Sequence, residues 1–371
     1  MSTRARSALL FTAVALFAFT GQGAAADVQD TRAYLQTFGS APSSVPHKKL
    51  LWPVKPFARP VPIRSTFGEP RSIVMDRHGL KGYAFHEYLY SLNQVSAPGR
   101  RMIHDGIDLV IPRGTLVYSL ENGRARLGGI KPFAAWVQVG NFRYEHIRSL
   151  VKPGQKVIAF KTPIGRIITP DHHLHLTRYH RGKAINPLAF GGFVGYKDML
   201  APRVSDPLFY GADGVRLDPA NLSGRIAIAV KTSDPQSQAS LAPLTSRGLI
   251  KSGQLRDLRL FGPATHAGTG VYGLSYAIED ELGTPVMGPY DVYRADGIVN
   301  QFIGDRLYTV ASNRNDFVHH IWTRLSLRSP DGDGYLDTGM LAPGNYRVRV
   351  AARDVVGNLT TEFFPITIAP R

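Results

Sequence analysis

Short stretches in which apolar and polar residues alternate recur along the chain and are separated by turn residues. In the first half they read "GIDLVIP", "TLVYSL", "GRARLGGI", "WVQVGNF", "KVIAF" and "HLHLTRY". Each stretch is rich in β-branched or aromatic residues and is bounded by Gly or Pro, which is typical of a half-buried strand. The 26 prolines and 37 glycines also favour strands and turns over helices. We therefore predict an all-β domain over residues 61–190.

A second set of alternating stretches follows a loop-rich linker at residues 191–221. In "NYRVRVAA", Tyr346, Val348 and Val350 share one face of a strand. "GRIAIAV" alternates in the same way, and the turn "DVVGN" leads into "LTTEFFPITI". Short strands at this spacing predict an immunoglobulin-like β-sandwich over residues 222–371. We expect the sandwich to bury its own core and to serve as a binding or spacing module that the chemistry does not need.

The start of the chain has the pattern of a secretory signal peptide. Arg4 and Arg6 precede an apolar run at residues 8–19, and small residues ending in "AAA" follow. We expect cleavage after residue 26, which leaves a Pro-rich lead-in at residues 27–60. An uncleaved anchor is the alternative, but the run is shorter than the ~20 residues of a membrane helix. The mature protein is then expected in the periplasm or at the cell wall, without stable membrane insertion.

Charge and cysteine content narrow the classes of partner and site. The formal charge is +16 and the chain has no cysteine. In a cytoplasmic protein such a charge would indicate nucleic acid, whereas in an exported protein it indicates an acidic polymer or a membrane surface. Peptidoglycan is one such polymer, because its stem peptides carry free carboxylates. Without cysteine, a zinc site would have to use His, Asp or Glu as ligands.

The histidines are most crowded at residues 171–175, which read "DHHLH". In a strand, His173 and His175 would point to the same face. Upstream, "HDGIDLVIP" places His104 and Asp108 four residues apart, so an extended segment would put these two on one face as well. Two histidines and a carboxylate are typical of a catalytic zinc site with one position left for water. A solvated polar turn is the alternative for H-x-H alone, because so short a match carries little information.

Together with the surrounding segments, these motifs resemble the lysostaphin-type zinc endopeptidases, the glycyl-glycine and peptidoglycan endopeptidase family. The resemblance covers residues 61–190 and includes "IRSTFGEPR", "HDGIDLVIPRGTLVYSLENGRA", "VQVGNFRYEHI", "VKPGQKV", "PIGRI", "HHLHL" and "INPLAF". It implies a Zn²⁺ cofactor and the three metal ligands His104, Asp108 and His175. It also implies that His173 lies beside the metal-bound water and that His146 lies across the site from it. No H-E-x-x-H motif is present, so these two imidazoles are expected to transfer protons.

The resemblance implies an enzyme that hydrolyses peptide bonds in peptidoglycan stem peptides or cross-bridges. Two departures from the family pattern alter the rim of the expected groove: the short "RIITPD" before H-x-H, and Leu176 and Thr177 where an aromatic–Glu pair is common. The alternatives are a non-catalytic wall-binding scaffold, an activator of another hydrolase, or a peptidase that acts on proteins. We expect the insertion at residues 73–102 to form one wall of the groove. We interpret "DGDGYLD" at residues 331–337 as a tight turn, because a calcium loop would need a later Glu ligand.

Overall fold

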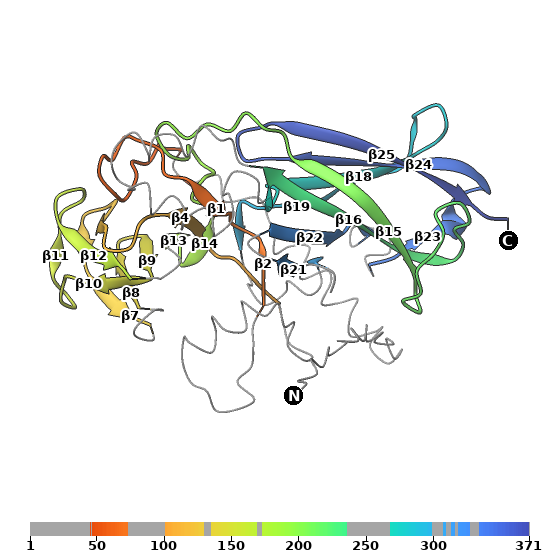
Figure 1. The fold of residues 1–371 in the computed structure, drawn as a ribbon. Coiled ribbons are helices and arrows are strands. Elements are labelled where there is room, and N and C mark those ends of the chain that lie inside the picture. The colour runs from red at the N-terminus through yellow and green to blue at the C-terminus, as the bar shows by residue number, and fades with distance from the viewer. Residues whose placement is uncertain are drawn as a thin grey trace, which may run out of the picture.

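The structure is a computed structural model of the chain. It describes residues 45, 47–72, 101–129, 135–168, 173–235, 268–298, 307–308, 313–315, 318–326 and 334–370. These residues form antiparallel β-sheets, which confirms the predicted all-β class (Figure 1). Within them, no helix is long and apolar enough to cross a membrane. The predicted signal peptide, most of the lead-in, the insertion between residues 73 and 100, and His172 lie outside the described residues.

One sheet organises the N-terminal region, residues 47–190. Its strand order is β1 (Ile63–Ser65), β4 (Ile107–Val110), β13 (His173–His180), β9 (Phe142–Glu145), β8 (Trp136–Val139) and β7 (Arg126–Gly128). Exposure alternates along β8 and β9 as the sequence predicts, because every second side chain faces the core. The central strand β13 is instead buried from His173 to Arg178, since strands flank it on both sides.

Three smaller sheets complete the N-terminal region. They pair β10 (Ile147–Ser149) and β5 (Leu116–Tyr118) with β12 (Pro163–Ile167), β11 (Lys156–Val157) with β6 (Gly123–Arg124), and β2 (Pro70–Ser72) with β3 (Arg101–Ile103). The strands β10, β11 and β12 lie on the side of β13 away from the C-terminal strands (Figure 1).

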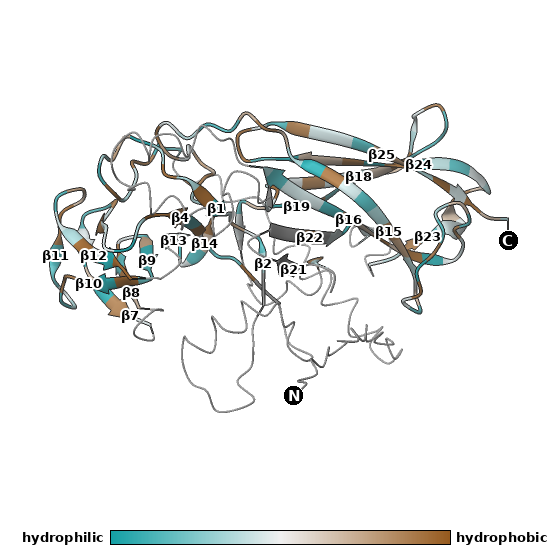
Figure 2. Ribbon diagram, viewed as in Figure 1, coloured by the Kyte–Doolittle hydropathy of each residue, from teal (hydrophilic) through white to brown (hydrophobic). Residues whose placement is uncertain are grey.

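The C-terminal region, residues 191–370, contains two sheets. One is built from β15 (Arg203–Gly211), β16 (Arg225–Pro235), β17 (Gly268–Thr269), β21 (Asn313–Asn315), β22 (Val318–Arg324) and β23 (Leu336–Asp337). The other has the order β19 (Pro285–Arg294), β18 (Gly273–Glu279), β24 (Gly344–Arg353) and β25 (Leu359–Ile368). Val348 and Val350 are buried and Tyr346 is half-buried, in agreement with the predicted apolar face. Apolar and polar positions alternate along these strands (Figure 2).

The two regions are joined by backbone pairing and by a common core. Strand β14 (Lys183–Ile185) pairs with β13 on one side and with β20 (Gly297–Ile298), from the C-terminal region, on the other. Most of the buried apolar side chains of both regions belong to one continuous cluster. The predicted domain boundaries stay a prediction, but the alternation of apolar and polar residues did not indicate this shared sheet and shared core.

Candidate metal centre

Strand pairing and a bend bring the three predicted ligands together. Asp108 in β4 lies opposite His175 in the antiparallel partner β13, and His104 lies in the connection between β3 and β4. The connection is not extended throughout, as the sequence argument assumed, because it bends at Gly106 before β4 begins. The bend, rather than strand alternation alone, turns His104 toward Asp108.

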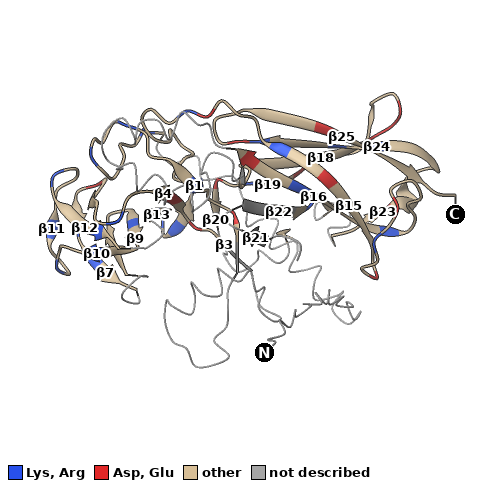
Figure 3. Ribbon diagram, in the orientation of Figure 1, with Lys and Arg blue, Asp and Glu red and all other residues tan. Residues whose placement is uncertain are grey.

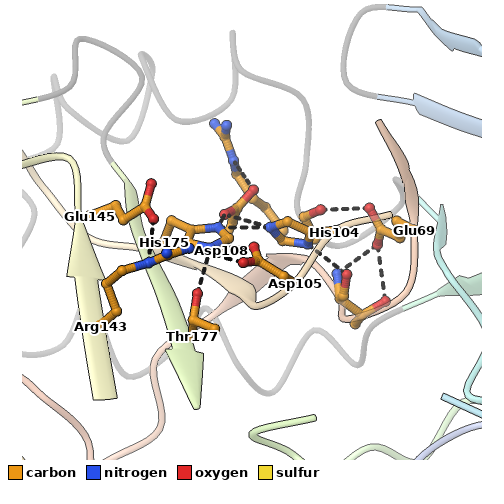
Figure 4. Close-up of polar contacts among 11 residues, drawn as sticks. Glu69, His104, Asp105, Asp108, Arg143, Glu145, His175 and Thr177 are labelled. Atoms are coloured by element: carbon orange, nitrogen blue, oxygen red, sulfur yellow. Dashed lines mark hydrogen bonds and ion pairs between the residues drawn. The ribbon is translucent and has the colours of Figure 1, made fainter. Parts of the chain in front are cut away.

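The ligand atoms form a small triangle (Figure 4). Nε2 of His104 lies 3.2 Å from Oδ1 of Asp108 and 2.9 Å from Nδ1 of His175. Nδ1 of His175 lies 3.1 Å from the same Asp108 oxygen. A tetrahedral zinc ion with bonds of 2.0–2.1 Å separates its ligand atoms by about 3.3 Å. The triangle therefore fits three corners of such a site.

The outer hydrogen bonds of the two imidazoles leave lone pairs at the centre of the triangle. Nδ1 of His104 lies 2.7 Å from the Thr66 carbonyl oxygen, which can only accept, so this nitrogen carries the proton. Nε2 of His175 lies 3.2 Å from Oδ1 of Asp105 and 2.9 Å from the Thr177 hydroxyl. It donates to these oxygens, which leaves Nδ1 unprotonated in the neutral ring. Three lone pairs then face one another, an arrangement that a cation stabilises.

Burial and the neighbouring charges shift the pKa values of the residues that form the triangle. The side chains of His104, Asp108 and His175 are all buried. Burial raises the pKa of the Asp108 carboxyl, but His104 and His175 outweigh burial and hold this pKa well below its ordinary value. Burial lowers the pKa of His175, whereas hydrogen bonds with Asp105 and Asp108 raise it to about 10. Without a metal His175 therefore holds an additional proton, which a bound ion would displace.

Arg143 holds Asp105 in place behind His175. Its Nη2 donates to Oδ2 of Asp105 at 2.9 Å, and its Nε lies 2.7 Å from Oε1 of Glu145 (Figure 4). Carboxylates that orient a metal-binding imidazole in this way raise its basicity as a ligand. The sequence analysis missed Asp105 and Arg143. The only sequence signal is the position of Asp105 directly after His104.

The glycine in "HDGID" is required by close packing. A Cβ atom at Gly106 would lie 2.5 Å from the Leu176 carbonyl oxygen and 2.8 Å from Nε2 of His175. Real Cβ contacts are not this short, and the carbonyl oxygen belongs to the central strand. Only glycine therefore lets the connection approach β13 closely enough for His104 to complete the triangle.

The structure places His146 and His173 next to the triangle. Their ring centroids are 4.4 Å apart, and the His146 ring lies 6.3 Å from that of His175. His173 is buried at the start of β13, whereas His146 is half-buried just after β9. The backbone of His146 has φ of 66°, a conformation that is strained for a residue other than glycine. Their predicted catalytic roles stay predictions, and their location is compatible with those roles.

No protein family model matches the chain. Among solved structures, the chain is similar to a zinc-containing peptidase from Vibrio cholerae, with 22% sequence identity and a TM-score of 0.25. The match covers 38% of this chain and 39% of that one, so the chain spans about two fifths of the length of that peptidase.

Proposed function

We propose that the protein is a zinc metalloendopeptidase that hydrolyses peptide bonds in peptidoglycan stem peptides or cross-bridges. The observation that carries the proposal is the convergence of one lone pair each from His104, Asp108 and His175 at mutual distances of 2.9–3.2 Å. Two imidazoles and one carboxylate are a ligand set of catalytic zinc sites. When bound, zinc would polarise the scissile carbonyl and lower the pKa of a bound water toward neutrality.

Other residues of the chain are proposed to orient the metal ligands and to transfer protons. Thr66 and Asp105 fix the tautomers of His104 and His175 through hydrogen bonds to their outer nitrogens. His146 and His173 lie beside the ligands and are proposed to take a proton from the attacking water and deliver one to the leaving amine. An imidazole suits this task because its ordinary pKa lies near neutral pH.

The proposed substrate is anionic, and the surface charge is compatible with it. Lysines and arginines are exposed on β7, over the small sheets and in the loops near them at the end of the N-terminal region (Figure 3). They are Arg113, Arg124, Arg126, Arg148, Lys152, Lys156, Lys161 and Arg166. A polymer with repeated carboxylates would be attracted to this surface in a salt-dependent manner. We further propose, from the signal-peptide pattern, that the protein acts in the periplasm or at the cell wall.

The test is incubation of the purified mature protein with isolated peptidoglycan, with and without a zinc chelator. We expect peptide fragments, identified by mass spectrometry, that disappear with the chelator and in the His104→Ala variant. The His146→Ala variant keeps all three ligands, so it should retain zinc while releasing far less fragment than the wild type. If the protein binds zinc but releases no fragment, peptidoglycan is not its substrate, and the scaffold, the activator or a peptidase that acts on proteins replaces the proposal. Release that persists in His104→Ala would contradict the proposed site.

A further inference from the structure

The Glu69 carboxylate accepts hydrogen bonds from both regions of the chain. Its side chain is fully buried. Oε1 accepts from the backbone N–H of Thr66 at 2.6 Å, and Oε2 accepts from the Ser65 hydroxyl at 2.5 Å. Oε1 also accepts, at 2.9 Å, from the N–H of Gly270, which lies 201 residues further along the chain. The carboxylate thereby ties the turn at residues 66–69 to the C-terminal region.

The same turn holds the predicted ligand His104. The Thr66 carbonyl accepts from Nδ1 of the His104 ring at 2.7 Å. The His104 backbone N–H donates to the Glu69 carbonyl at 2.8 Å, and the Gly68 N–H donates to the His104 carbonyl at 2.9 Å. Both the ring and the backbone of His104 are therefore positioned by residues 66–69.

The C-terminal region contacts this turn at two points. Besides the Gly270 N–H, the buried Tyr308 hydroxyl donates to the Gly68 carbonyl at 2.6 Å. The Thr66 hydroxyl lies 3.0 Å from both Oε1 of Glu69 and the Gly270 carbonyl oxygen. The C-terminal region thus fixes the Glu69 side chain through Gly270 and the backbone of the turn through Tyr308.

We propose that the C-terminal region positions the metal ligand His104 through the Gly270–Glu69 and Tyr308–Gly68 contacts, so that both regions form one metal-binding unit. The inference deepens the proposed function and rests on its metal site, but not on the reaction or substrate. It reverses the expectation that the chemistry does not need the C-terminal region. Glu69, Gly270 and Tyr308 are positioning residues, because they act through the turn.

Gly270→Ala is the sharpest test, because the new Cβ atom would press on the Glu69 side chain. A Cβ atom at this position would lie 2.7 Å from Cγ of Glu69 and 3.4 Å from the Thr66 hydroxyl. Gly273→Ala is the matched control in the same segment. There the nearest atoms would be the Tyr293 carbonyl at 3.8 Å and Cβ of Arg353 at 3.9 Å, which are ordinary contacts.

The measurements are the zinc dissociation constant, from competition with a chelating dye, and the NMR resonance of the His104 Nδ1–H proton. We expect Gly270→Ala to weaken zinc binding by about 10-fold or more, the effect of disturbing an outer partner of a ligand. We also expect the proton resonance to shift or to be lost. In Gly273→Ala the dissociation constant should stay within about twofold of the wild-type value. A role confined to stability would lower the unfolding temperature without changing zinc affinity in the folded protein.

Tyr308→Phe keeps the ring and removes only the hydroxyl that contacts Gly68. We expect zinc binding to weaken by about threefold, since one hydrogen bond to the turn is lost. Tyr346→Phe is its control, because the Tyr346 hydroxyl donates to Ala342, in the C-terminal region. A folded Tyr308→Phe variant with wild-type zinc affinity and an unchanged His104 resonance overturns the inference, whether or not Gly270→Ala folds. A wild-type protein that binds no zinc overturns the proposed function instead.

Discussion

The molecule buries two groups of potential metal ligands, and their chemistry differs. In the N-terminal region, the Asp108 carboxylate lies between the imidazoles of His104 and His175. In the C-terminal region, carboxylate oxygens of three buried aspartates lie within 4.8 Å of one another. These aspartates are Asp198, Asp234 and Asp354. Among the described residues, these are the two groups with the composition and spacing of metal ligands.

The pKa values of the buried acids in the two groups are shifted in opposite directions. Burial raises the pKa of both Asp108 and Asp234, but His104 and His175 overcome this effect at Asp108. At Asp234, the neighbouring Asp198 and Asp354 add to burial and hold the pKa well above its ordinary value. The first group therefore keeps its carboxylate charged beside two imidazoles, whereas the second favours the protonated form of Asp234, which reduces the repulsion among its carboxylates. Proximity of buried carboxylates alone does not make a metal site.

The largest expected effect is the loss of zinc when one ligand of the first group is removed. His104→Ala and Asp108→Ala each delete one corner of the triangle. We expect the wild-type protein to bind close to one zinc per chain and both variants to lose tight binding in a chelator competition. Asp234→Asn, in the second group, is the control and should keep one zinc per chain. Loss of zinc in Asp234→Asn alone would show that the metal binds at the second group and not at the first.

The next largest expected effect is a loss of turnover without a loss of zinc, which distinguishes catalytic residues from metal ligands. His146→Ala and His173→Ala leave the triangle intact, so both variants should retain zinc. Their turnover of a peptidoglycan peptide should fall by about 100-fold or more if each imidazole transfers protons. Measured together, zinc content and turnover distinguish the roles. Zinc loss in either variant equal to that of His104→Ala would show that the histidine is a ligand.

A smaller effect is expected from Asp105, which orients His175 without touching the predicted metal position. Asp105→Asn keeps the shape of the side chain and removes its charge. Zinc affinity should fall by about tenfold, because the His175 imidazole becomes a weaker donor. Asp291→Asn removes a charge from an exposed position of β19 and is the control. Equal affinities for Asp105→Asn and the wild type would remove Asp105 from the site.

The smallest effect concerns the pH dependence of stability at the second group. Because the pKa of Asp234 is raised in the folded state, its stabilising contribution is complete below pH 3.8 and is lost as pH rises through the folded-state pKa. Asp234→Asn stays neutral, so it should raise the unfolding temperature at pH 8 and have little effect at acid pH. An Asp234→Asn variant that is less stable than the wild type at pH 8 would contradict the raised pKa.

Asp354→Asn is the matched control within the same group. Oδ1 of Asp354 accepts from the backbone N–H groups of Val356, Gly357 and Asn358. Replacing this carboxylate should destabilise the protein by about 1–2 kcal/mol, because hydrogen bonds to a charged acceptor are weakened. Opposite effects of the two substitutions would show that the aspartates of the second group are not equivalent.

The sequence predicts the parts of the site that depend on local patterns. The all-β class follows from the alternation of apolar and polar residues, and the placement of His173 and His175 follows from the period of a strand. The spacing of "HDGID" and "HLH" indicated candidate ligands on shared faces, and the family resemblance implied His104, Asp108 and His175 among them, although the bend at Gly106 was not foreseen. Such patterns carry information only about residues that lie a few positions apart in the sequence.

The contacts that orient these ligands could not be read from the sequence. Thr66 lies 38 positions before His104, and Gly270 lies 201 positions after Glu69. Their partners are set by how β1, β4 and the C-terminal strands pack, and no local periodicity encodes that packing. The same holds for the pairing of β14 with β20, which joins the two predicted domains. Contacts in which one partner is a backbone group leave little trace in the type of residue that supplies it.

The most direct test of the central claim is a crystal structure of the zinc-loaded protein with diffraction recorded on both sides of the zinc absorption edge. We predict one anomalous peak within about 2.0–2.2 Å of Nε2 of His104, Oδ1 of Asp108 and Nδ1 of His175. The group at Asp198, Asp234 and Asp354 should show no peak. A peak at the three aspartates and none at the histidines would contradict the account, as would zinc-loaded crystals with no peak at either group.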